Sequence, residues 1–107
     1  MSRIIYNKLI RDKIPEIIEA SNRKYNIEPY PDNEFDLALR EKLVEEAQEV
    51  VKSGNDHLII ELADTTEIIY ALMEYHHITE SDLEQVRLHR LQERGGFTKK
   101  LKLLWTD

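Results

Sequence analysis

The chain contains no cysteine, and it is poor in glycine and proline, with three residues of each. Without cysteine there are no disulfides, no zinc–thiolate sites and no thiol chemistry. Few glycines and prolines leave few places for tight turns, so the composition favours long uninterrupted helices over a β fold with many turns.

Long apolar runs are also missing. No stretch approaches the roughly 20 apolar residues that a transmembrane helix needs, and the first residues lack the apolar segment of a secretory signal. The formal net charge of −6 gives no basic footprint for a nucleic-acid polymer. We therefore expect a cytoplasmic enzyme or binding protein that binds neither a membrane nor a nucleic-acid polymer. Single nucleotides remain candidate ligands, because a few local cations and a metal ion can hold them.

The length and the apolar content suit one compact domain. A chain of 107 residues with 41% hydrophobic residues can build one core and is too short for two. The sequence predicts a single all-α domain over residues 1–107, a bundle of about four helices with short extended terminal segments. The terminal segments, residues 4–6 and 97–105, are candidates for a short pair of strands. The helices are expected at about residues 13–24, 34–53, 55–77 and 80–94.

Each expected helix is preceded by a residue whose side chain can accept hydrogen bonds from the first turn. Thr79 with Asp82 resembles a capping box, and Gly95-Gly96 should end the last helix. The expected caps of the other three helices are Asp12, then Asp32 or Asn33, then Asn55 or Asp56.

Four acidic residues stand out by their spacing around the break near Gly54. Glu46 and Glu49 are three residues apart and share a helix face, and Glu61 and Asp64 repeat that offset on the next helix. The two pairs lie at similar distances from the break. If the helices are antiparallel, the pairs face each other at the same height, within about one turn.

The surroundings of these acids decide how they can be held. The second helix of the pair is apolar on most of its circumference, so it must be buried, in part against another subunit. Two like charges about 4 Å apart repel by about 4 kcal/mol at an effective dielectric near 20. Carboxylate oxygens without cysteine or histidine suit a hard ion, Mg²⁺ or Mn²⁺. From spacing alone, a metal site and the solvated sides of two amphipathic helices are equally favoured.

Three cations near the N-terminus form a second candidate group. Lys8, Arg11 and Lys13 can be a solvated basic patch or a clamp for phosphate oxygens. The residues alone leave both interpretations open.

Four segments of the chain resemble motifs of one enzyme superfamily. Glu45-Glu46-Ala47-Gln48-Glu49 and Glu61-Leu62-Ala63-Asp64 are similar to the EExxE and ExxD motifs of the all-α nucleoside triphosphate pyrophosphatases. That superfamily includes the MazG proteins, the dimeric dUTPases and phosphoribosyl-ATP pyrophosphohydrolase. The opening segment, residues 6–15, and Arg94-Gly95-Gly96-Phe97 further resemble a small single-domain MazG-like subgroup of house-cleaning pyrophosphatases.

The resemblance implies hydrolysis of a nucleoside triphosphate between the α and β phosphorus, which releases a monophosphate and pyrophosphate. Its motifs would make Glu46, Glu49, Glu61 and Asp64 the ligands of Mg²⁺. Glu45, Glu46 and Glu49 would be the catalytic residues, with Glu45 either handling the attacking water or supporting Lys42. The resemblance also implies a homo-oligomer, a dimer or a tetramer. The candidates for binding phosphates away from the metal are Lys8, Arg11, Lys13 and Arg94.

Two alternatives to this function remain. The same acidic scaffold serves phosphoribosyl-ATP cleavage in the related pyrophosphohydrolase. A non-catalytic regulatory or partner-binding helical protein could also retain the scaffold. The preferred base of the nucleotide and the oligomer size are not set by the sequence.

Overall fold

The computed structural model describes residues 3–107 and contains four α-helices and no strand within them. The helices are α1 (Ile14–Ala20), α2 (Asp32–Lys52), α3 (Leu58–Tyr75) and α4 (Glu80–Arg94). The prediction of an all-α chain with about four helices is confirmed. None of these helices has the combination of length and apolar character that a membrane crossing requires.

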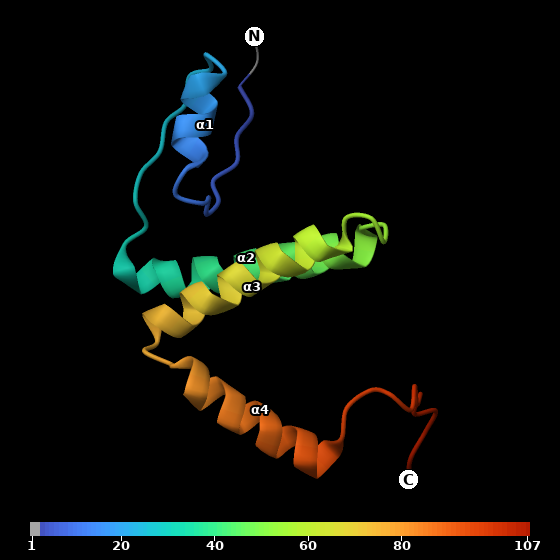
Figure 1. Cartoon of the computed structure of the whole chain (residues 1–107). Helices are drawn as coiled ribbons and strands as arrows, with labels where there is room; N and C mark the ends of the chain where they lie inside the picture. The colour runs from blue at the N-terminus through green and yellow to red at the C-terminus, as the bar shows by residue number, and fades with distance from the viewer. Residues whose placement is uncertain (1–2) are drawn as a thin grey trace.

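The structure is centred on α2 and α3, which lie antiparallel and side by side (Figure 1). We call this pair the α2–α3 hairpin. The residues in its core are Ala38 and Leu39 from α2 and Ile68 and Met73 from α3. Its open end is closed by Tyr75, whose ring meets that of Phe35 edge-on at 5.6 Å between centroids. The Tyr75 hydroxyl also donates a 2.8 Å hydrogen bond to the Asp32 carbonyl, which fixes the register of the two helices.

The other two helices leave the hairpin. Among the described helices, α2 and α3 are the only pair that pack together. In Figure 1, α1 lies on one side of the hairpin with the N-terminal segment beside it, and α4 diverges on the other side. The predicted pairing of residues 4–6 with residues 97–105 is therefore wrong, because the N-terminal segment lies on one side of the hairpin and α4 places the C-terminal segment on the other (Figure 1).

The last helix begins and ends as predicted. The Thr79 hydroxyl accepts a 3.0 Å hydrogen bond from the Asp82 amide, and the Asp82 carboxylate accepts a 3.1 Å bond from the Thr79 amide. Gly95 ends α4 with a φ of 76°, a left-handed conformation that glycine adopts at little cost.

The predicted caps of the other helices are wrong. The residues before α1, α2 and α3 are Lys13, Pro31 and His57, and none of them caps with its side chain. Asp32 instead lies inside the first turn of α2, where a negative charge is favourable next to the helix N-terminus. α1 ends early, because Asn22 takes a left-handed conformation with a φ of 57° just after the Ser21 cap.

Candidate metal site

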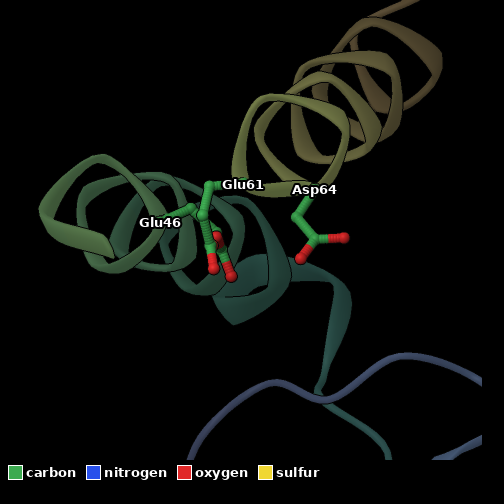
Figure 2. Close-up of side chains that lie close together, drawn as sticks. All are labelled: Glu46, Glu61 and Asp64. Carbon is green, nitrogen blue, oxygen red and sulfur yellow. The ribbon is translucent and has the colours of Figure 1, made fainter. Parts of the chain in front are cut away.

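Three of the four predicted metal ligands meet between the central helices. Glu46 comes from α2, and Glu61 and Asp64 come from α3. One oxygen of each side chain lies within 4.8 Å of those of the other two, and all three residues are half-buried. Figure 2 shows the carboxylates converging on the side of the hairpin along which the N-terminal segment passes. We call these three residues the acidic cluster.

Glu46 is the most constrained member of the acidic cluster. Its Oε2 atom is buried and has no hydrogen-bond partner within residues 3–107. Burial raises the pKa of the Glu46 carboxyl above its ordinary value, and the neighbouring carboxyls of Glu61 and Asp64 raise it further. A buried carboxylate oxygen without a partner is unfavourable, so it attracts a proton or a cation.

Two cations of the N-terminal segment contact the same region. Arg11 donates a 3.1 Å hydrogen bond from Nη1 to Oδ1 of Asp64, a member of the acidic cluster. Lys8 donates a 2.8 Å hydrogen bond from Nζ to Oε1 of Glu45 on α2. These two ion pairs attach the N-terminal segment to both helices of the hairpin.

Glu45 is neutralised by lysines rather than by the acidic cluster. Lys42 Nζ lies 3.5 Å from Glu45 Oε1, so that this oxygen contacts two ammonium groups. The hydrogen bond from Lys8 lowers the pKa of the Glu45 carboxyl, and the charge of Lys42 adds to the effect. The same hydrogen bond raises the pKa of the Lys8 ammonium. Both groups are therefore held in their charged forms at neutral pH.

The remaining predicted site residues are not brought to the acidic cluster. Glu49, one turn further along α2, is exposed and lies outside the group of carboxylates that converge. Lys13 is exposed at the start of α1, and Arg94 is exposed at the end of α4, which diverges from the hairpin (Figure 1). Their roles in metal or phosphate binding stay predictions.

The sequence interpretation missed a small hollow next to the acidic cluster. The hollow lies between the N-terminal segment and α2, and it contains Lys42 and Glu41 beside Glu45. A helical pattern could have found both as neighbours of Glu45, because Glu41 and Lys42 lie four and three residues before it on α2. Asn7 also lines the hollow, and its left-handed φ of 46° turns the N-terminal segment toward α2. The full lining is Asn7, Lys8, Leu9, Tyr30, Ala38, Glu41, Lys42 and Glu45.

The donor set of the acidic cluster fits a hard divalent cation. It offers carboxylate oxygens from two helices, with no nitrogen or sulfur ligand, and this set suits Mg²⁺ or Mn²⁺. The orphaned Oε2 atom of Glu46 is the part of the cluster that a cation would satisfy most directly. No family model, no curated protein and no solved structure matches the chain.

Proposed function

We propose that the protein is a Mg²⁺-dependent nucleotide pyrophosphohydrolase. It would cleave a nucleoside triphosphate between the α and β phosphates and release a monophosphate and pyrophosphate. The observation that supports this most strongly is the convergence of Glu46, Glu61 and Asp64 around a buried, unpartnered oxygen. The resemblance of these residues to the EExxE and ExxD motifs of the MazG-like enzymes supports the same function.

The acidic cluster would hold the metal, Mg²⁺ or Mn²⁺, and Glu49 would join it from the next turn of α2. A bound divalent ion supplies charge neutralisation at phosphate oxygens and a lowered pKa for a bound water. Glu46, Glu61 and Asp64 would fix the position of that charge, because they project from two helices that pack against each other.

The N-terminal segment would bind the phosphates. Lys8 and Arg11 already lie against carboxylates at the edge of the site, so their charged groups are within reach of an oxyanion bound there. Glu45 has two candidate roles, to handle the attacking water or to support a neighbouring lysine. Its ion pairs with Lys8 and Lys42 favour the second role. A carboxylate whose pKa is lowered is a weaker base, so Glu45 is better suited to positioning Lys8 than to deprotonating water.

A hydrolysis assay over a panel of nucleotides, with the products identified, tests the proposal. We expect Mg²⁺-dependent release of pyrophosphate, and we expect Asp64→Asn to lower turnover by on the order of 100-fold or more, because it removes a charge from the ion's site. Glu28→Gln is the matched control, since Glu28 is an exposed acid in the linker before α2. An Asp64→Asn variant with normal Mg²⁺-dependent turnover would overturn the site.

The same assay separates the two alternatives. Activity confined to phosphoribosyl-ATP would identify the protein as a phosphoribosyl-ATP pyrophosphohydrolase. Absence of turnover on every substrate, together with Mg²⁺ binding to the acidic cluster, would identify a non-catalytic helical protein that retains the scaffold. Release of a single phosphate instead of pyrophosphate would contradict all three functions.

A further inference from the structure

The isolated chain exposes far more surface than a compact domain of its size. Its accessible surface is 10355 Å², whereas a compact monomer of 12.7 kDa exposes about 6,200 Å². Its radius of gyration is 18.3 Å, against about 13 Å for a compact chain of this length. The excess of roughly 4,000 Å² is larger than the 1,000–2,500 Å² or so that each copy contributes to an obligate dimer. Contact through one flat face would leave much of this surface exposed.

One exposed apolar surface runs along the outer side of α3. Ile59, Leu62, Ala63, Thr66 and Tyr70 follow helical spacing, and all five are exposed. Ile59 is 76% exposed, and Leu62 and Tyr70 are each 48% exposed. We call these residues the outer stripe. It contains no ionisable group other than the Tyr70 hydroxyl, and it faces away from α2, on the opposite side of α3 from the buried Ile68.

A second apolar surface belongs to the C-terminal tail, residues 95–107. The tail follows α4 (Figure 1), and its large apolar side chains are exposed to solvent. Burial of large apolar side chains such as these is favourable. Their exposed fractions are 96% for Phe97, 85% for Leu101, 81% for Leu103, 79% for Leu104 and 80% for Trp105.

Charge indicates what covers the outer stripe. α3 carries Glu61, Asp64, Glu67 and Glu74 and has no lysine or arginine. Pairing α3 with the α3 of a second copy would bring like charges together, which is unfavourable. The tail is basic, because Lys99, Lys100 and Lys102 outnumber its one acidic side chain, that of Asp107. The tail therefore complements α3 in both charge and apolar character.

The tail is also long enough, and it is placed away from its own hairpin. Residues 97–100 form a turn, in which the Lys100 amide donates a hydrogen bond to the Phe97 carbonyl and Lys100 has a φ of 56°. The five residues that follow, 101–105, reach about 17 Å when extended, which matches the span of about 17 Å of the outer stripe from residue 59 to residue 70. α4 has 15 residues, diverges from the hairpin, and so separates the tail from the outer stripe of the same chain.

We propose that two copies of this chain exchange their C-terminal tails. The tail of each copy packs along the outer stripe of α3 in the other copy, with its lysines beside Glu67 and Glu74. The exchange buries the exposed side chains of both surfaces at once. It also makes the association intertwined, which covers more of the excess surface than contact through one flat face would.

Trp105 provides a direct test, because it is the sole tryptophan of the chain. We expect sedimentation to give a dimer or a multiple of it, with a blue-shifted Trp105 emission. Leu62→Glu, which places a charge in the outer stripe, should lower the mass and shift the emission to that of water-exposed tryptophan. Val51→Glu is the matched control, since Val51 is an 85% exposed apolar residue on α2, outside the stripe. An equal effect of both substitutions, or a water-exposed Trp105 in the unaltered oligomer, would overturn the exchange.

Cysteine cross-linking remains decisive if Leu62→Glu fails to fold, and the absence of native cysteine removes any background. The double variant Leu62→Cys/Leu103→Cys should form a covalent dimer on oxidation, whereas Val51→Cys/Leu103→Cys should not. A disulfide closed within one chain would show that the tail folds back on its own helix, and failure to cross-link would exclude the contact. Neither experiment uses metal or nucleotide, so its result does not depend on the proposed enzymatic function.

Discussion

Glu46 is the residue at which burial and charge oppose each other most directly. Its Oε2 atom is buried without a partner, and Glu61 and Asp64 lie beside it. Because the folded state raises the pKa of Glu46, it holds the Glu46 proton more tightly than the unfolded state does. The free energy of unfolding therefore decreases as the pH rises from the ordinary value near 4.5 through the raised pKa.

Glu46→Gln should accordingly stabilise the metal-free protein at pH 7, because it keeps the shape of the side chain and removes its charge. The gain should vanish at and below about pH 4.5, where the native carboxyl is also neutral. Thermal melts in EDTA at the two pH values measure this, with about 4–8 °C expected per kcal/mol. The control is Glu28→Gln, and a Glu46→Gln variant that is less stable than the unaltered protein at pH 7 contradicts the assignment.

At this scale, local spacing predicted part of the site. The offset of three residues, with Gly54 near the midpoint, was enough to place Glu46 opposite Glu61 and Asp64. Glu49 is exposed and is not in the acidic cluster, although its offset of three from Glu46 equals that of Asp64 from Glu61, so spacing alone did not decide which acids converge. Lys8 and Arg11, the N-terminal partners of Glu45 and Asp64, are 37 and 53 residues distant from them, so no local pattern could have identified these two pairs.

Among the elements, α4 depends most on its own caps, since none of the described helices packs against it. Thr79→Ala removes the hydroxyl that accepts a hydrogen bond from the Asp82 amide, and the loss of such a cap typically lowers helix stability by about 1 kcal/mol. We expect amide exchange in the first turn of α4 to accelerate about fivefold, because a loss of about 1 kcal/mol raises the equilibrium constant for local opening about fivefold. Ser81→Ala in the same turn is the control, and equal exchange rates in the two variants would show that the capping box does not support α4.

The helices with strong sequence signals were predicted better than those without. α4 has both a capping box and Gly95, and its bounds agree with the structure. α1 has neither, and it ends well before the predicted residue 24. The starts of α2 and α3 were misplaced by only a few residues, because tertiary packing rather than a cap decides where these helices begin.

At the scale of the whole molecule, Mg²⁺ should raise the melting temperature. A ligand that binds only the folded state adds about 2.7 kcal/mol at 100 times its Kd, which corresponds to roughly 10–20 °C for a chain of this size. The physical source is the relief of repulsion within the acidic cluster. Melts at fixed protein concentration measure the shift, and Asp64→Asn should reduce it. An identical shift from KCl at the same ionic strength would show general screening instead of a bound ion.

The helical class of the molecule was predictable, but the arrangement of its outer parts was not. Apolar periodicity and scarce glycine indicate helices wherever they occur, so four helices were expected and found. The same periodicity does not say whether an apolar face meets its own chain or another copy. Phe97 and Trp105 show this, because the sequence suggested a strand and the structure leaves both side chains in solvent.

The attachment of the N-terminal segment to the hairpin has a consequence of its own. The side chains of the Lys8–Glu45 pair are 43% and 37% exposed, and those of the Arg11–Asp64 pair are 62% and 35% exposed. Ion pairs this open to solvent contribute about 0–1 kcal/mol each and are weakened by dissolved salt. The attachment of the segment therefore depends on ionic strength: it is tighter in dilute buffer and weaker at high salt concentration. A polyanionic ligand would compete with Glu45 and Asp64 for the same two cationic side chains, those of Lys8 and Arg11.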